Sequence, residues 1–296
     1  MSAVLLQQII LGLREGSLFA LVALGLVIVH KTTGVVNFAY GHMGMFAAYI
    51  TFTFYTLLGF NLYLAVAIGI TFAVFLGILT EKFLLRPIRH LSHSAMLIIT
   101  LGMLMILEGM ALLLWKQDFK QLPNLITGVP YRISLGNSFL IITRQDVLIF
   151  LVTTAIVFGT FFYLKYTKLG LAVRMVSQNE EASHLMGVKV GRVYVFAWGL
   201  GTGLSALAAI LAAPKEQVQP NMMLNLQIQG LTAAVLGGFD SLPGAIVGGV
   251  LLGIIEQLVA KYISVELKTA LALMVIIILL LVKPEGLLGK STKRRV

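Results

Sequence analysis

Long apolar runs separated by short polar segments dominate the chain. The runs cover residues 4–29, 45–58, 61–85, 94–115, 147–164, 193–213, 226–262 and 267–282. One helical crossing of a bilayer needs roughly 20 mostly apolar residues, so these runs predict about eight crossings or partial crossings. We therefore expect an all-α fold, a polytopic membrane helical bundle. Arg14 and Glu15 interrupt the first run, which predicts either packing of that pair against protein or an interfacial start to the helix.

Two glycine-rich segments interrupt this pattern within regions of membrane length. Residues 32–44 combine glycines with small polar side chains, and residues 237–244 read Gly-Gly-Phe-Asp-Ser-Leu-Pro-Gly. Glycine and proline at this density disfavour a continuous helix. Irregular backbone at membrane depth is tolerated only where protein or a water-filled cavity surrounds it. We expect broken or re-entrant helices at both places, the second as a hairpin of two short helices.

Cationic segments set the expected orientation. Basic residues follow the run that ends at residue 85, occupy residues 165–192, and form the tail Lys290, Lys293, Arg294 and Arg295. The positive-inside rule places these three segments in the cytoplasm and the linker 116–144 outside. Pro214 is expected to end the run 193–213 on the external side.

With the N-terminus placed inside, the first and last thirds show a similar pattern. Each third contains a glycine-rich break and ends in a basic residue followed by proline, at Arg86-Pro87 and at Lys283-Pro284. An internal duplication is a hypothesis that this similarity permits. The alternative is that the segments around the breaks are full short crossings.

Composition supports a membrane protein and excludes other classes. Hydrophobic residues make up 58% of the 296 residues and charged residues 11%, with a mean hydropathy of +0.95. A soluble domain is about a quarter charged. The net charge of +10 does not indicate nucleic-acid binding, because the cations lie between apolar runs and form no continuous basic face. The chain has no cysteine, and we expect no removable signal peptide.

Motifs of catalysis and nucleotide binding are not found. The sequence contains neither H-E-x-x-H nor G-x-S-x-G, which leaves hydrolysis without a candidate nucleophile or metal site. Residues 289–292, Gly-Lys-Ser-Thr, imitate the end of a P-loop, but Pro284 stands where the first glycine is required. We expect no catalytic residue, no metal and no cofactor in this chain, which is not an enzyme.

The first break carries polar side chains that could line a path for a polar solute. Asn37, Tyr40 and His42 place a carboxamide, a phenol and an imidazole beside glycine-permitted backbone. Broken helices expose free N–H and C=O groups that can bind such a solute. The alternative, at about even weight, is that Asn37 and His42 cap helix ends.

Three further polar residues are candidates for the same path. Glu108 is the only charge in the run 94–115, and an ionisable residue inside a membrane indicates function by default. A protonated or hydrogen-bonded structural glutamate is an equal alternative. Asp240 and Ser241 lie in the second break, where Asp-Ser-Leu-Pro favours a turn or N-cap role for Asp240.

Residues 171–188 predict a short amphipathic helix bounded by Gly170 and Gly187. Apolar residues recur at helical spacing, at Leu171, Met175, Ala182, Leu185 and Met186. The opposite face carries Arg174, Asn179, Glu180, Glu181 and His184. A helix lying on lipid is the alternative, but glutamates with few lysines match anionic headgroups poorly. A helix that docks its apolar stripe into a groove of a partner protein fits better.

Three segments together resemble the membrane subunit of the high-affinity branched-chain amino acid family of bacterial ABC importers. The first is Gly-Val-Val-Asn-Phe-Ala-Tyr-Gly at residues 34–41, which follows the apolar residues 20–26. The second, residues 170–174 continuing to 181–187, is similar to the E-A-A-x-x-x-G coupling loop of importers, with Ser183 at the second alanine. The third is residues 234–244, followed by 283–287. The resemblance runs essentially from end to end.

This resemblance implies a single transmembrane permease domain over residues 1–296, in the inner membrane of a bacterium. The family pairs such a permease with a second homologous permease subunit or a second copy of itself, two cytoplasmic ATPases and a periplasmic solute-binding protein. ATP and Mg²⁺ would be bound by the ATPases. The helix at about 170–188 would couple ATPase closure to the membrane, through Arg174, Glu180, Glu181, Ala182 and Gly187. Relatives carry branched-chain amino acids, urea, short amides or aromatic acids.

Other functions predict different behaviour. A stand-alone secondary transporter or channel would use an ion gradient through Glu108, but no linked series of acids supports a relay. An intramembrane enzyme would need an acid–base or metal constellation that the sequence does not offer. ATP-driven import of a small polar solute, a branched-chain amino acid first among them, is the expected function.

Overall fold

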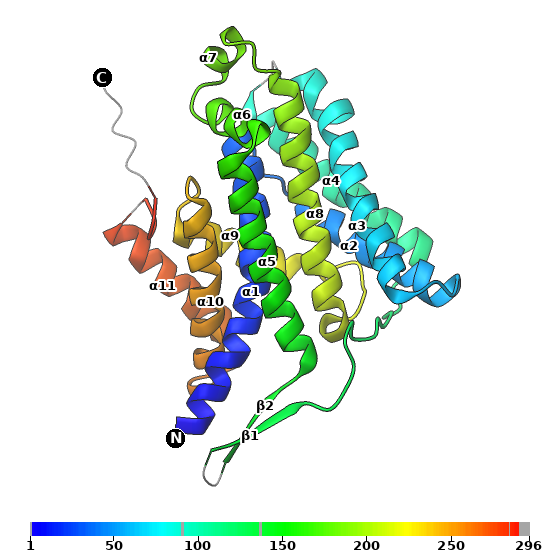
Figure 1. Cartoon of the computed structure of the whole chain (residues 1–296), viewed down its shortest axis with the longest axis vertical. Coiled ribbons are helices and arrows are strands. Elements are labelled where there is room, and N and C mark those ends of the chain that lie inside the picture. The colour runs from blue at the N-terminus through cyan, green and yellow to red at the C-terminus, as the bar shows by residue number, and fades with distance from the viewer. Residues whose placement is uncertain (1, 90–91, 136–137, 284, 290–296) are drawn as a thin grey trace. The chain divides into compact units, whose positions relative to one another are not determined.

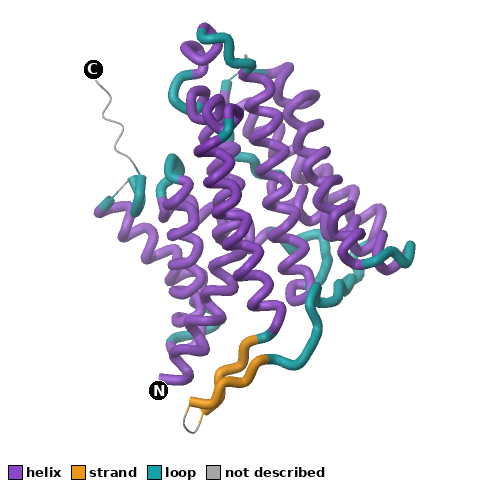
Figure 2. The backbone as a smooth tube through the Cα atoms, viewed as in Figure 1, coloured by secondary structure: helices purple, strands orange, loops and turns teal. Residues whose placement is uncertain are grey.

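Helices account for almost all regular structure in the computed structural model, which describes residues 2–89, 92–135, 138–283 and 285–289 (Figures 1 and 2). The α-helices are α1 Ser2–Thr33, α2 Tyr40–Phe52, α3 Leu62–Leu79, α4 His93–Trp115, α5 Arg144–Tyr166, α6 Lys168–Val176, α7 Glu180–Leu185, α8 Val190–Glu216, α9 Leu224–Gly237, α10 Leu242–Tyr262 and α11 Lys268–Val282. Two π-helical segments, Thr53–Leu57 and Thr80–Leu85, extend α2 and α3, and a 3₁₀ turn covers Arg86–Ile88. The all-α prediction is confirmed.

Six helical segments of the described chain are long and apolar enough to cross a membrane. They are Ala3–Thr33, Leu62–Ile88, Ser94–Trp115, Arg144–Tyr166, Val190–Glu216 and Leu242–Tyr262. The helices α2, α9 and α11 are shorter, with 13, 14 and 15 residues. The prediction of a polytopic bundle is confirmed, although α10, with 21 residues, is not the short helix expected after the second break.

Side-chain caps explain where several helices begin. A side-chain oxygen accepts a hydrogen bond from a backbone N–H of the first turn at Asn61, Ser92, Thr167, Asn179 and Ser241. Such a cap satisfies one of the N–H groups that a helix start leaves without an intrahelical acceptor. The predicted starts near residues 61 and 94 follow from this chemistry.

The chain divides into two compact units assembled from separate segments. The first unit contains residues 1–27, 124–155 and 228–296, and the second contains residues 28–123 and 156–227. Three helices, α1, α5 and α9, begin in one unit and end in the other. The single permease domain over 1–296 stays a prediction.

In the second unit, α2, α3 and α8 form the packed core, and small residues allow their close approach. A Cβ atom on Gly44 would overlap Ser205 of α8, and one on Gly77 would overlap Thr202 of the same helix. Trp198 of α8 has no exposed surface. Because lipid supplies no hydrophobic driving force between helices, this close backbone packing is the main source of their association.

In the first unit, α1 and α10 meet through glycines. A Cβ atom on Gly12 or Gly16 of α1 would overlap the backbone of α10, and one on Gly249 or Gly253 of α10 would overlap α1. This arrangement of small residues at four-residue spacing is the membrane form of close helix packing.

The basic segments lie at one end of the second unit, as predicted. Arg86 donates a hydrogen bond from Nη2 to the backbone oxygen of Gly191, at 3.2 Å. The end of the helical segment Leu62–Ile88, which corresponds to the third apolar run and which we call the third span, therefore lies beside the start of α8. At the other end of α8, Lys120 of the linker and Val218 form an antiparallel bridge. We call the end with Arg86 and Gly191 the basic end. The basic tail 290–296 and Pro284 lie outside the described residues.

The expected placement of the N-terminus is wrong. The Gln7 side chain exchanges two hydrogen bonds with the backbone of Ile141, of 2.9 and 2.8 Å, so α1 begins beside the linker. The other end of α1, at Thr33, lies beside Arg89 at the basic end. Within the first unit, the start of α1 is therefore on the same side as the strand Ser138–Ile142 of the linker. Residues 1–8 carry no cation that could have indicated their side.

Each break lies close to the segment that follows a later helix of the same unit, α11 in the first unit and α3 in the second. In the first unit, Leu287 and Leu288 donate backbone hydrogen bonds of 2.9 and 3.0 Å to Leu236 and Gly237. In the second unit, Val35 lies beside Arg89, which follows the third span. If the chain contains an internal duplication, the two repeats would therefore be α1–α2–α3 and α9–α10–α11.

Two details of the linker and of α8 differ from expectation. The strands β1 Tyr131–Leu135 and β2 Ser138–Ile142 pair as an antiparallel hairpin (Figure 2), whereas the all-α expectation included no strand. Pro214 does not end α8, which continues to Glu216 and closes at Gln217 with φ of +61°. Proline removes a single N–H donor, and in a last turn the helix tolerates that loss before it ends.

Candidate functional site

The break between α1 and α2 is built around the carboxamide of Asn37. Gly34 leaves α1 with φ of +70°, a conformation that favours glycine. Asn37 is 1% exposed, and its Oδ1 accepts a hydrogen bond of 3.0 Å from the N–H of Ala39. This Asx turn directs the chain into α2. Asn37 was expected either to line a solute path or to cap a helix end. The structure shows it in a structural role, as the side chain that forms the turn before α2.

Gln227 fastens the start of α2 from the other side. Its Oε1 accepts a hydrogen bond of 2.7 Å from the N–H of Gly41, and its Nε2 donates one of 2.8 Å to the oxygen of Phe38. Ser205 donates from Oγ to the oxygen of Tyr40, at 2.7 Å. Gln227 thereby satisfies two backbone groups at the break, and Ser205 adds a contact to the first turn of α2. Sequence reasoning missed Gln227, although an amide within the apolar helix α9 was a signal.

Other polar groups of α2 are buried with no hydrogen-bond partner in the described part of the protein. They are Nδ1 and Nε2 of His42 and the hydroxyls of Tyr40 and Tyr49. His42 is 3% exposed and Tyr40 is fully buried. The half-buried Glu108 acts on His42 electrostatically, so the two predicted residues lie in one neighbourhood. His42 therefore does not cap a helix end.

This arrangement suits polar contact with a solute better than chemistry. An unpaired buried phenol or imidazole costs about 1–3 kcal/mol, so such groups are expected to find a partner in some state of the protein. No group of three or more His, Cys, Asp or Glu residues that could hold a metal occurs among residues that the structure describes. Asn37 lies in the break, Tyr40 and His42 begin α2, and Glu108 of α4 acts on His42; all four belong to the second unit.

The second break belongs to the first unit and has a different chemistry. Ser241 is the N-cap of α10, and its Oγ accepts a hydrogen bond of 3.1 Å from the N–H of Gly244. Asp240 is exposed. The helix start that the sequence predicted at Asp-Ser-Leu-Pro is confirmed, but the capping residue is Ser241 and not Asp240.

The predicted coupling helix at 170–188 is wrong as a single helix. The segment forms α6 and α7, which are separated at residues 177–179. Asn179 starts the second helix, because its Oδ1 accepts a hydrogen bond of 2.9 Å from the N–H of Ala182. An asparagine favours an N-cap over a helix interior, which divides the segment. We call α6 and α7 with their connections the coupling segment.

The coupling segment presents apolar side chains that the described chain leaves uncovered. Leu185 is 88% exposed and Met186 is 64% exposed. Gly187 closes α7 with φ of +81°. Arg174 donates to the backbone oxygen of Lys165, at 3.2 Å, and so faces α5. Glu180 and Glu181 occupy the first turn of α7, where carboxylates favour the helix dipole.

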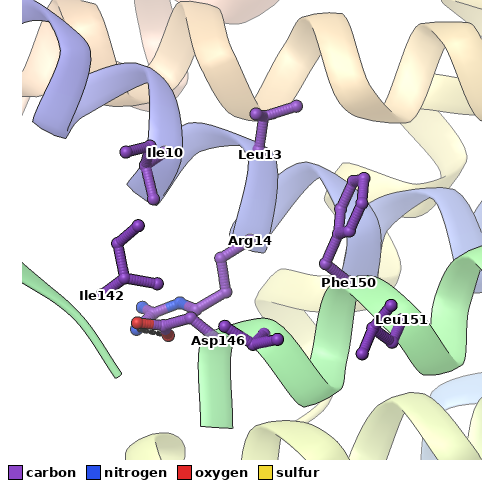
Figure 3. A pocket seen from close by; sticks show the side chains of 8 residues that line it. Ile10, Leu13, Arg14, Ile142, Asp146, Phe150 and Leu151 are labelled. Atoms are coloured by element: carbon purple, nitrogen blue, oxygen red, sulfur yellow. Dashed lines mark hydrogen bonds and ion pairs between the residues drawn. The ribbon is translucent and has the colours of Figure 1, made fainter. Parts of the chain in front are cut away.

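Arg14 and Glu15 were expected either to pack against protein or to mark an interfacial helix start, and the contacts of Arg14 in the first unit bear on this choice. Arg14 forms ion pairs with Glu15 and with Asp146 of α5, the latter at 3.1 Å. Figure 3 shows the Arg14 and Asp146 side chains facing each other beside a mostly apolar groove of about 220 Å³. The charged pair is therefore packed against protein, the first of the two expected alternatives.

Comparison with known proteins decides the family. Residues 8–282 match the family described as the permease component of branched-chain amino acid transport systems. The chain belongs to this family. The match spans most of the chain, and it confirms the family that the sequence resembles.

Individual relatives agree with this assignment. The chain is 31% identical to the high-affinity branched-chain amino acid transport system permease protein BraD of Pseudomonas aeruginosa, over 98% of each chain. It is 30% identical to the LivH permease of Escherichia coli, over 98% of this chain and 97% of the relative. It is 26% identical to the probable LivH permease of Methanocaldococcus jannaschii, over 94% of this chain and 90% of the relative.

A solved structure was also compared. PsaBC from Streptococcus pneumoniae in complex with a Fab aligns over 93% of this chain and 90% of that chain, with 15% identity and a TM-score of 0.43. Family membership and the six apolar helices make this chain a multi-pass membrane permease component, in a family of transport proteins and not of enzymes.

Proposed function

We propose that this chain is the membrane permease of an ATP-driven importer that moves a branched-chain amino acid into the cytoplasm. The names of the relatives from Pseudomonas aeruginosa and Escherichia coli support this substrate class. The proposal places the chain in the inner membrane of a bacterium, with the basic end in the cytoplasm. Urea, a short amide or an aromatic acid are the other solutes to test.

The partners in this proposal supply what the chain itself lacks. ATP and Mg²⁺ are bound by two cytoplasmic ATPases, a periplasmic binding protein delivers the solute, and a second homologous permease subunit or a second copy of this chain completes the membrane part. The chain then needs a surface for the ATPase and a path for the solute.

The exposed coupling segment is the observation that carries the proposal. Leu185 and Met186 project at the basic end, where the positive-inside rule places the cytoplasm. Large apolar side chains exposed at a helix tip are typical of a docking site for a protein groove. Glu180, Glu181 and Gly187 frame this tip, with Ala182 inside α7 and Arg174 on α6.

The solute path is proposed at the first break. Tyr40 and His42 offer buried polar groups that lack a partner in the described residues, Asn37 shapes the backbone, and Glu108 supplies the nearby charge. Asp240 and Ser241 are the corresponding candidates in the second break. The neutral hydrogen-bonding groups suit transient contact with a zwitterion, which should pass without tight binding.

Substitution of the helix tip tests the proposal. Leu185→Glu should abolish copurification of the ATPase in mild detergent, because a charge replaces the apolar anchor. Leu58→Glu is the matched control, since Leu58 is 55% exposed between α2 and α3 and lies outside the coupling segment. Retention of the ATPase by Leu185→Glu would refute docking at this segment.

A further inference from the structure

A small cavity at the basic end of the second unit connects the first break with the coupling segment. It has a volume of about 80 Å³. Its walls include Val35, Glu81, Arg89, Glu180, Tyr194 and Trp198. The break contributes Val35, the third span contributes Glu81, and the coupling segment contributes Glu180. Three functional regions of the unit therefore meet at one place.

A continuous series of polar contacts crosses this cavity. Glu81 is 1% exposed and forms ion pairs with Arg86, at 3.0 Å, and with Arg89, at 2.6 Å. The guanidinium carbon of Arg89 lies 3.8 Å from the ring centroid of Tyr194. Tyr194 and Glu180 both line the cavity, and the Glu180 carboxylate acts electrostatically on the Tyr194 phenol. The contacts run from a buried acid on the third span to an exposed acid on α7.

The members of this series differ in how firmly they are held. Removing one partner of a buried ion pair is strongly destabilising, so Arg89 is fixed on Glu81. Tyr194 is 3% exposed on α8 and stacks against that guanidinium. Glu180 is exposed and begins the six-residue helix α7. Glu180 is thus the point at which movement of the coupling segment reaches the buried cluster.

The cavity itself is closed to a solute of amino-acid size. Its volume leaves room for only a few water molecules. Trp198, which lines the cavity and is fully buried, has an Nε1 donor without an acceptor in the described part of the chain. A wider cavity would allow this donor to meet a solute carboxylate, and the Arg89 guanidinium lies on the same wall.

We propose that Glu180, Tyr194, Arg89 and Glu81 form the cytoplasmic gate of the solute path, opened when α7 is displaced by its partner. Because Glu180 of α7 and Tyr194 of α8 line the same cavity, displacement of α7 withdraws the carboxylate from the Tyr194 phenol and separates the walls of the cavity. This inference rests on the proposed function, and it adds the residues through which the coupling segment acts and a polar exit site for a zwitterion.

Tyr194→Phe is the decisive variant, because it removes the hydroxyl and keeps the ring that packs on Arg89. Since Tyr194 is buried, the variant leaves the surface of the coupling segment unchanged. The complete complex in liposomes is supplied with binding protein, leucine and ATP, and leucine uptake is measured per ATP hydrolysed. We expect this ratio to fall roughly ten-fold, because the hydroxyl no longer interacts with the charged Glu180 carboxylate, with ATP hydrolysis retained.

Tyr166→Phe is the matched control, because Tyr166 is 63% exposed on α5 and lies outside the cavity. It should leave the ratio unchanged. In a Glu180→Ala background, Tyr194→Phe should have no further effect, because the interaction of the hydroxyl with the carboxylate is already lost. An unchanged ratio in Tyr194→Phe, or a full additional loss in the double variant, would overturn the gate.

Failure of the gate can be separated from failure of the proposed function. If the unmodified complex takes up no leucine with ATP, the proposed function fails. If the unmodified complex and both tyrosine variants take up leucine with the same ratio, the gate alone fails.

Discussion

Gln227 and Gly41 are joined by a hydrogen bond of 2.7 Å from the glycine N–H to the Oε1 of the glutamine. The same side chain donates to the oxygen of Phe38, at 2.8 Å. One amide thus supports both sides of the turn that begins α2, on which the buried phenol and imidazole are mounted. The break is a defined structure and not a loose connection.

Replacement of Gln227 should therefore destabilise the protein and reduce transport. Gln227→Ala leaves an N–H and a C=O without their partner, at a cost of about 1–3 kcal/mol. Thermal unfolding in detergent measures the loss. Asn225→Ala, at an exposed position of the same helix α9, is the control and should unfold like the parent. Equal unfolding temperatures for both variants would contradict the role of Gln227.

Close packing of α2 on α8 predicts a second effect. A Cβ atom on Gly44 would overlap the backbone and the hydroxyl of Ser205, so Gly44→Ala should destabilise by about 1–3 kcal/mol. On α4, a Cβ atom on Gly109 meets no atom within 4 Å. Gly109→Ala should be neutral or raise stability by up to about 1 kcal/mol, because alanine favours a helix. Thermal unfolding distinguishes the two, and similar shifts would show that α2 and α8 are less closely packed.

The buried polar groups of α2 predict opposite effects on stability and on transport. Tyr40→Phe and His42→Leu remove polar atoms that lack partners among the described residues, so unfolding should require equal or higher temperature. If these atoms contact the solute, uptake by the complete complex should fall. Loss of stability together with loss of uptake would instead indicate a structural role.

Much of the fold follows from the sequence because apolar length determines a membrane helix. The runs that begin near residues 94 and 147 correspond to α4 and α5, and the glycines at 237–244 do interrupt the helices. The family was recognisable from residues 34–41, 170–187 and 234–244. These are local signals, and they need no knowledge of tertiary contacts.

Other features depend on contacts that no local pattern contains. Gln227 acts on Gly41, 186 positions away, and Glu81 is neutralised by cations that the orientation rule counts only as topology signals. The predicted orientation of α1 was wrong, because the true orientation depends on the contact between Gln7 and Ile141, which no local pattern contains. The division of the coupling segment depends on one cap, at Asn179, which competed with a helical pattern that continued across it.

Uptake of leucine into liposomes tests the central claim most directly. The chain is reconstituted alone, or with its second permease subunit, ATPase and binding protein, and each preparation is tested with ATP and with an ion gradient. The account predicts uptake that requires ATP, the ATPase and the binding protein together. Uptake by the chain alone, driven by a proton or sodium gradient, would contradict it and would identify a secondary transporter.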